Sequence, residues 1–210
     1  DVQDSIKKGV EDIPEFLHQA EAQVFEATQA GESHGLVPFQ SVLGSFVAEI
    51  ERRSASKEDF HGLRTGFTEI DKITQGLRPH QIWVVAARPG MGKTSFVLSV
   101  VQNVCLRGSG VVAFFSMEMS QLELAMRLMS GLTRVDAKRL SLGRMIDREW
   151  QQLAQAADMA SRAKLYIDDS GGITVLDIRA RCRRAKHKEK RLDLVIIDYI
   201  QLIRPLQQRS

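Results

Sequence analysis

The sequence predicts an α/β protein with a mainly parallel sheet, preceded by a helical region. From Arg64 onward, apolar runs of strand length alternate with segments whose apolar residues recur at helical spacing. Before that point only helical spacing is present. A glycine-rich turn also connects the first strand pattern to the first helix pattern, as in many α/β folds.

The composition is that of a folded globular protein. Of the 210 residues, 43% are hydrophobic and 26% are charged. No apolar run reaches the roughly 18 residues of a membrane span, and residues 1–8 lack the apolar core of a signal peptide. Cys105 and Cys182 lie far apart without a CxxC pair, which argues against a disulfide framework or a zinc site. We therefore expect a cytoplasmic protein with no membrane partner.

Two helices are expected before the α/β part. Asp12 and Glu15 form a capping pattern that opens the first helix, over residues 12–30. The second helix begins near Pro38, and a polar stretch over residues 52–59 follows it as a linker. One face of this second helix is apolar along its whole length, through Phe39, Val42, Leu43, Phe46, Val47 and Ile50. This face either packs on its own domain or docks on a neighbouring subunit, and the pattern leaves both open.

Strands and helices then alternate. Strands are expected over residues 81–87, 111–115, 164–168 and 192–199. Between them, helices are expected over residues 93–107, 120–129, from 147 onward, and over 174–191. Ser120 with Glu123, and Thr174 with Asp177, are capping boxes that fix two of the helix starts. Because each strand reaches the next through a helix, the sheet should be mainly parallel and covered on both faces.

The turn after the first expected strand reads A-R-P-G-M-G-K-T and matches the phosphate-loop pattern, with Ala87 at the usual position of the first glycine. Backbone N–H groups of such a turn surround phosphate oxygens at a helix N-terminus. Lys93 would contact the β- and γ-phosphates, and the Thr94 hydroxyl would bind Mg²⁺. The nucleotide-binding residues expected are therefore Ala87, Arg88, Pro89, Gly90, Met91, Gly92, Lys93, Thr94 and Ser95, with ATP and Mg²⁺ as ligands.

Two carboxylates follow strand patterns. Asp198 ends an apolar run, at the sheet edge where α/β proteins bind ligands, and is a candidate Mg²⁺ ligand. Glu118 follows the second expected strand and is a candidate base that orients the attacking water. The alternative is that Glu118 only favours the dipole of the next helix, and that Asp198 is an ordinary acid at a strand end.

With these residues placed, the chain resembles the DnaB-type replicative helicases, RecA-fold hexameric motors. Four stretches between residues 64 and 203 carry the resemblance: T-G-F-T-E-I-D at 65–71 with Q-G-L at 75–77, the phosphate loop, F-S-M-E-M at 115–119, and V-I-I-D-Y-I-Q-L at 195–202. The resemblance implies a RecA-like P-loop ATPase that translocates on single-stranded DNA and unwinds duplex DNA. It implies Lys93 and Glu118 as catalytic residues, and Thr94 and Asp198 as metal ligands.

The resemblance also implies partners and boundaries. Residues 1–33 would end an N-terminal helical region, residues 36–63 would hold the linker helix and flexible linker, and residues 64–210 would form the ATPase domain. The linker helix, residues 38–53, would join identical subunits into a homohexamer, with a primase and a helicase loader as further partners. Such helicases continue beyond the metal-binding strand with DNA-binding loops and an arginine finger, so we expect a fragment with low turnover by itself.

The basic helix over residues 174–191 concentrates the positive charge. Residues 179–191 hold eight basic residues and one acid, a formal +7, so the remaining chain carries −4 of the total of +3. Ile178, Cys182 and Ala185 should form its buried side. The remaining face is either solvated or subunit-facing, or it contacts DNA phosphates directly.

Three other functions stay open from the sequence. A RecA-fold ATPase that does not unwind DNA, such as a recombinase or a regulatory ring protein, shares the same motifs. A small-molecule kinase would use Glu118 on a hydroxyl rather than on water. An oligomerisation module would depend only on the linker helix.

Overall fold

The computed structural model describes residues 36–55 and 62–204. The chain divides into two compact units, Asp1–Lys57 and Glu58–Ser210. No helix within the described ranges is long and apolar enough to cross a membrane. The helix expected over residues 12–30 lies outside the described residues.

The described part of the first unit is one helix, α3 (Phe39–Ala55), which confirms the second expected helix. Its apolar side chains are all exposed within this chain. The linker prediction was wrong for residues 52–55, which continue the helix. A salt bridge of 2.8 Å between Glu49 and Arg52, one turn apart, supports this last part of α3.

The second unit contains a parallel three-stranded sheet of order β2-β1-β3, composed of β1 (Val111–Ser116), β2 (Lys164–Asp168) and β3 (Leu194–Asp198). The central strand β1 is buried along its whole length. Phe114 on β1 lies opposite Ile167 on β2 and Ile196 on β3. Three of the four expected strands and their parallel arrangement are therefore confirmed.

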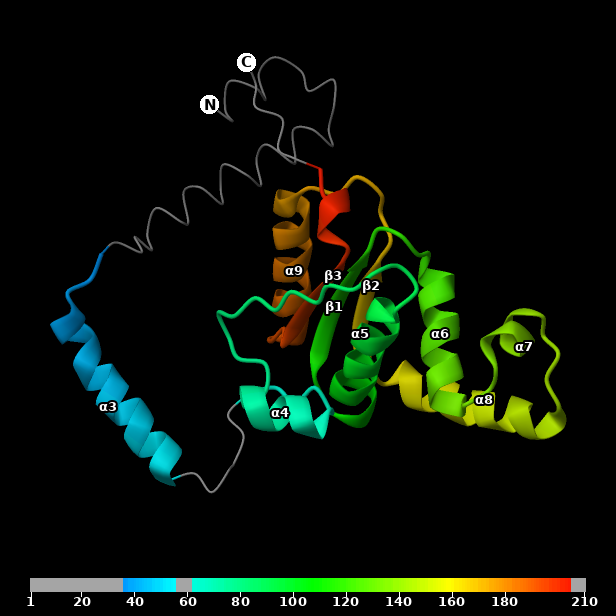
Figure 1. Ribbon diagram of the computed structural model, residues 1–210, viewed down its shortest axis with the longest axis horizontal. Coiled ribbons are helices and arrows are strands. Elements are labelled where there is room, and N and C mark those ends of the chain that lie inside the picture. The colour runs from blue at the N-terminus through cyan, green and yellow to red at the C-terminus, as the bar shows by residue number, and fades with distance from the viewer. Residues whose placement is uncertain (1–35, 56–61, 205–210) are drawn as a thin grey trace, which may run out of the picture. The chain divides into compact units, whose positions relative to one another are not determined.

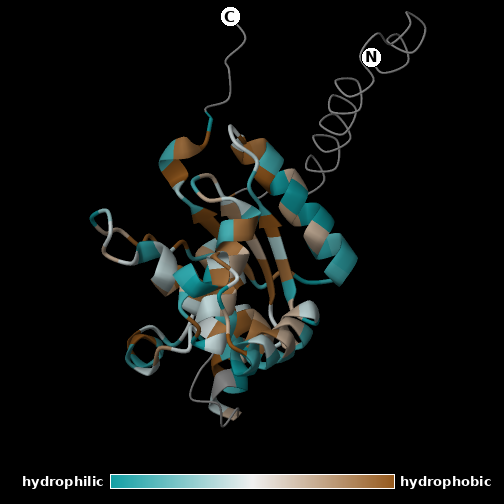
Figure 2. Ribbon diagram, turned by 90° about the vertical axis from the view of Figure 1, so that its right-hand side faces the viewer, coloured by the Kyte–Doolittle hydropathy of each residue, from teal (hydrophilic) through white to brown (hydrophobic). Residues whose placement is uncertain are grey.

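Helices cover both faces of β1, as expected (Figure 1). On one face α5 (Lys93–Val101), the π-helical segment η1 (Gln102–Arg107) and α6 (Gln121–Thr133) contribute to a core that includes Val101, Phe114 and Leu124. On the other face, Ile178 of α9 (Val175–Glu189) is buried with Ala113 and Phe115. Figure 2 shows the hydrophobic strands and the mostly hydrophilic outer side of α9.

The prediction of a strand over residues 81–87 was wrong. The segment forms no strand, and its side chains are exposed, with Ile82 at 92% and Val84 at 83%. An apolar run forms a strand only where a neighbouring strand accepts its backbone hydrogen bonds. In the described sheet, β3 pairs with β1 alone, and Val195 and Ile197 of β3 are 41% and 36% exposed.

Helix starts agree with the expected caps. Ser120 and Glu123 form a capping box at α6, and Thr174 and Asp177 form one at α9. The helix beginning at Lys93 changes from α to π geometry after Val101, which the apolar spacing does not predict.

Three short elements were not predicted. One is α4 (Thr68–Thr74), where buried Asp71 accepts hydrogen bonds from the Thr65 N–H at 2.9 Å, the Thr65 hydroxyl at 2.7 Å and the Gly66 N–H at 3.1 Å. The others are α7 (Ala137–Ser141) and the 3₁₀ turn η2 (Ile200–Leu202).

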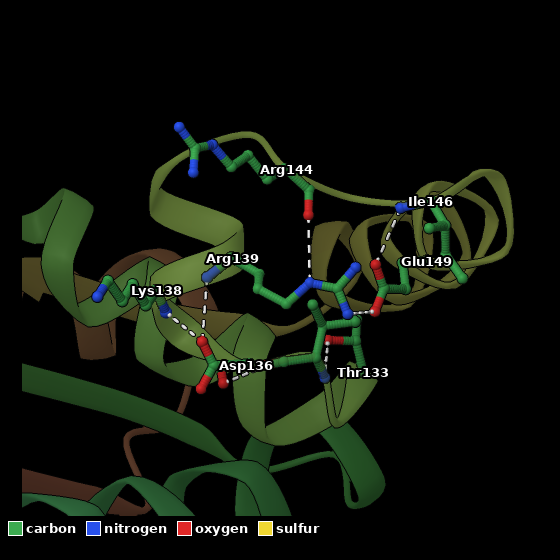
Figure 3. Close-up of polar contacts among 9 residues, drawn as sticks. Thr133, Asp136, Lys138, Arg139, Arg144, Ile146 and Glu149 are labelled. Carbon is green, nitrogen blue, oxygen red and sulfur yellow. Dashed lines mark hydrogen bonds and ion pairs between the residues drawn. The ribbon is translucent and has the colours of Figure 1, made fainter.

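A polar network holds α7 beside α8 (Asp147–Ser161), as Figure 3 shows. The Arg139 guanidinium donates to the Arg144 carbonyl at 3.2 Å and to the Glu149 carboxylate at 2.7 Å. The other oxygen of Glu149 accepts from the Ile146 N–H at 3.0 Å. Glu149 thereby joins the start of α8 to the middle of α7.

Candidate nucleotide-binding site

The phosphate-loop sequence forms an exposed turn that leads directly into α5. Gly90 and Gly92 adopt φ values of +79° and +86°, in the left-handed region that favours glycine. Gly92 is the residue before the helix, and its carbonyl accepts from the Phe96 N–H at 2.9 Å. The turn therefore precedes a helix N-terminus, where backbone N–H groups favour an anion.

Asp198 joins the two functional residues of this loop. Its Oδ1 lies 3.0 Å from the Lys93 ammonium, and its Oδ2 accepts from the Thr94 hydroxyl at 2.8 Å. Asp198 is 6% exposed and ends β3 opposite Ser116, the last residue of β1. Two distant parts of the sequence, residues 93–94 and Asp198, thus meet at the carboxyl edge of the sheet.

Tyr199 is a residue of this cluster that the sequence analysis missed. The Lys93 ammonium lies 4.7 Å from the centroid of the Tyr199 ring, within the range of a cation–π contact. The only signal in the sequence is an aromatic residue directly after Asp198. Lys93 is therefore held between a carboxylate and an aromatic face.

The residues present fit a magnesium ion. A hydroxyl from Thr94 and a carboxylate from Asp198 are hard oxygen donors already within 2.8 Å of each other. In the described residues no group of three or more His, Cys, Asp or Glu side chains could enclose a metal. Proteins commonly hold Mg²⁺ through one or two side chains together with water and substrate phosphates.

Glu118 is not joined to this cluster. It is exposed in the turn after β1, where Ser116 accepts from the Met119 N–H at 3.1 Å and donates to the Met119 carbonyl at 2.7 Å. No hydrogen bond or ion pair in the described part of the chain connects Glu118 with Lys93 or Thr94. Ala87, Arg88, Pro89, Gly90, Met91, Gly92 and Ser95 are all exposed along the loop and its flanks.

The fold and the loop sequence together place the chain in the class of phosphate-loop α/β domains. The sequence-family model described as the DnaB-like helicase C-terminal domain matches residues 62–210. The chain belongs to this family.

Curated relatives are replicative DNA helicases. The chain is 37% identical over 193 residues to the replicative DNA helicase DnaC of Bacillus subtilis, and 36% identical over 201 residues to the replicative DNA helicase DnaB of Haemophilus influenzae. Each match covers 92% of this chain but only 42% and 43% of the relative, so the chain spans less than half the length of these proteins.

Two solved structures agree with the fold. One is described as an ATPase domain, with a TM-score of 0.74 and 29% identity, covering 80% of this chain and 60% of that chain. The other is a DnaB-like replicative helicase studied with primase, with a TM-score of 0.72 and 27% identity, covering 100% of this chain and 48% of that one. The predicted RecA-like ATPase fold is confirmed.

Proposed function

We propose that this chain is the nucleotide-binding part of a replicative DNA helicase, in which ATP hydrolysis drives translocation on single-stranded DNA and unwinding of the duplex at the replication fork. The observation that carries this proposal is the meeting of Lys93, Thr94 and Asp198 at the carboxyl edge of a parallel sheet, in a chain of the helicase family.

The proposed chemistry divides among four side chains. The Lys93 ammonium neutralises charge on the β- and γ-phosphates, and backbone N–H groups of residues 87–95 surround them. Thr94 and Asp198 would hold Mg²⁺, which when bound supplies positive charge at the phosphate oxygens. Glu118 would orient the attacking water and accept its proton, provided that the exposed turn that carries it moves toward the nucleotide.

The proposed partners follow from α3 and from the relatives. The exposed apolar face of α3 fits a contact with an identical subunit, which supports a homohexamer joined through residues 38–53. One similar structure is of a helicase with its primase interactions, and we propose primase, a loader and single-stranded DNA as partners in the cytoplasm. The domain boundaries at residues 33, 36, 63 and 64 belong to the same proposal.

The site is tested by nucleotide binding and by steady-state ATP hydrolysis with and without single-stranded DNA. We expect Lys93→Ala and Thr94→Ala to lower hydrolysis by about 100-fold or more, because transition-state charge loses its stabilisation. Lys72→Ala is the matched control, since Lys72 is an exposed lysine of the same unit, paired with Glu69. Equal hydrolysis by Lys93→Ala and Lys72→Ala would overturn the proposed site.

Unwinding separates the candidate functions. Strand separation of a forked duplex by the protein that contains this chain supports the helicase. DNA-stimulated ATP hydrolysis without strand separation would instead indicate a non-unwinding ATPase. Formation of ADP only in the presence of a small hydroxyl acceptor would indicate a kinase.

A further inference from the structure

The basic helix α9 borders a pocket that the proposed ATP site does not use. The pocket has a volume of about 270 Å³ and lies between α9, β1 and β2. Apolar side chains, among them Phe115 and Ile167, form part of its lining, together with Tyr166, Arg184 and Lys188. Pockets for drug-sized ligands measure roughly 300–1,000 Å³, so this one suits a single ring system.

Tyr166 presents a fixed aromatic face at this pocket. Its hydroxyl donates to the Glu189 carboxylate at 2.5 Å, and Glu189 also forms a 2.7 Å salt bridge with Lys164. The ring is therefore held at its hydroxyl end by the last residue of α9. The Lys188 ammonium lies over the ring, 5.3 Å from its centroid, so a cation from α9 already contacts this face and a base that stacks there has to displace it.

The basic side chains that line the pocket differ in whether a carboxylate pairs with them. Arg181 is engaged by Asp168 and donates to the Ser170 hydroxyl at 3.0 Å. Arg184, one turn further along α9, is exposed and forms no ion pair with a carboxylate in the described part of the chain. Arg184 and Lys188 thus supply positive charge in the pocket lining, together with the Tyr166 ring and the apolar side chains of Phe115 and Ile167, which we call the apolar floor.

We propose that this pocket binds one nucleotide, with its base against Tyr166 and the apolar floor and its phosphate on Arg184 and Lys188. Aromatic faces beside basic side chains are the arrangement by which proteins bind single strands without sequence preference. The bound nucleotide is either part of a DNA single strand or a free mononucleotide. The first of these two possibilities rests on the proposed function. An acidic peptide could satisfy the cations but would leave the aromatic face unused.

The test measures the affinity of the complete chain for a fluorescein-labelled oligothymidine across a series of salt concentrations. We expect Arg184→Glu to weaken binding about tenfold and to lower the slope of log K against log salt by about 0.7, the value for one lost phosphate contact on a single strand. Lys186→Glu is the matched control, because Lys186 is also exposed on α9 but does not line the pocket. We expect it to change affinity less than about twofold at physiological salt, where exposed charges are screened.

Tyr166 tests the stacking part separately. Tyr166→Ala should weaken oligothymidine binding about tenfold, whereas Tyr166→Phe keeps the ring and should bind as the wild type does. Thermal unfolding of each variant shows whether the fold is kept. If Tyr166→Ala unfolds, Tyr166→Leu, which keeps an apolar side chain without an aromatic face, takes its place and should show the same tenfold loss.

The source of the nucleotide is distinguished with a labelled mononucleotide in a Lys93→Ala background, which removes binding at the phosphate loop. Mononucleotide binding that persists there and is lost with Arg184→Glu identifies a free nucleotide as the ligand. Oligothymidine binding without mononucleotide binding identifies the single strand.

Equal losses of oligothymidine affinity in Arg184→Glu and Lys186→Glu would overturn the proposed pocket, because they would indicate diffuse attraction of DNA to the charge of α9. Binding of an acidic peptide, with no binding of either nucleotide probe, would also overturn it. In both cases ATP hydrolysis and unwinding still report on the proposed function independently.

Discussion

Lys93 and Asp198 form a 3.0 Å ion pair between the phosphate loop and the end of β3. The same carboxylate accepts from the Thr94 hydroxyl at 2.8 Å. Asp198 therefore engages the two side chains that we propose for phosphate and magnesium. A phosphate at Lys93 would share the ammonium with Asp198 or displace it, and a divalent cation would offset the repulsion between phosphate and carboxylate.

Asp198→Asn should uncouple nucleotide binding from magnesium. The neutral amide neither repels phosphate nor holds Lys93 in an ion pair, so ATP without Mg²⁺ should bind a few-fold more tightly than in the wild type. Addition of Mg²⁺ should then increase the affinity little, because a carboxylate ligand is lost. Calorimetric titration with Mg²⁺ and with a chelator measures both effects. Asp158→Asn, at an exposed salt bridge with Arg162, is the control, and an unchanged Mg²⁺ dependence in Asp198→Asn would contradict the expectation.

Asp71 should be a main source of stability for the segment around α4. Asp71→Ala leaves the Thr65 N–H, the Thr65 hydroxyl and the Gly66 N–H without their acceptor. We expect a loss of about 3 kcal/mol in the free energy of unfolding. Glu69→Ala, on the same helix at an exposed salt bridge with Lys72, should cost less than about 1 kcal/mol. Urea denaturation measures both, and similar losses would show that the buried hydrogen bonds of Asp71 contribute little.

The protein should lose stability in acid partly through Asp168. Burial raises the pKa of this carboxyl, but hydrogen bonds from Arg181 and Ser170 lower the pKa by more than burial raises it. The folded-state pKa of Asp168 therefore lies below its usual value. A depressed pKa contributes stability above the unfolded-state value, near 4, that is lost as the pH falls through the folded-state value.

The stability difference between wild type and Asp168→Asn should therefore shrink from about pH 6 to about pH 3. Guanidinium denaturation at several pH values measures it. Asp158→Asn again serves as the control, because its exposed pair with Arg162 should contribute little at any pH. A difference that stays constant with pH would rule out this role of Asp168.

The two thiols should differ in reactivity. Burial raises the pKa of Cys105 to about 12, and Cys105 is 4% exposed. Burial also raises the pKa of Cys182, which is only half-buried. Because the thiolate is the reactive form, iodoacetamide should modify Cys182 first and Cys105 only on unfolding. Mass spectrometry of the native and the denatured protein measures the order. Modification of Cys105 in the native protein as rapidly as Cys182 would show that its site opens readily.

Features set by neighbouring residues were predictable from the sequence. The capping boxes at Ser120 and Thr174 depend on residues three positions apart, and both were predicted correctly. The buried side of α9, including Ile178 and Cys182, follows from helical spacing alone. The position of Asp198 at the carboxyl edge of the sheet was also predictable, because parallel strands place their carboxyl ends at one edge.

Features that depend on distant contacts were not predictable. The segment over residues 81–87 has the composition of a strand, but hydrogen bonding to a neighbour decides whether it forms one. The short helix α7 has a local cap at Asp136, but its contact from Arg139 to Glu149, ten positions later, is one that no local pattern reveals. The position of Lys93 against the Tyr199 ring depends on how β3 ends.

The run of helix from Lys93 through η1 has a mechanical consequence. Its first residues contact Asp198, and near its other end the Asn103 amide donates to the Thr65 carbonyl at 2.9 Å. The fit there is tight, since a Cβ on Gly66 would lie 2.0 Å from the Asn103 amide nitrogen. Contacts near both ends therefore restrain this helix, and the two contact sites lie about 15 Å apart along the helix axis.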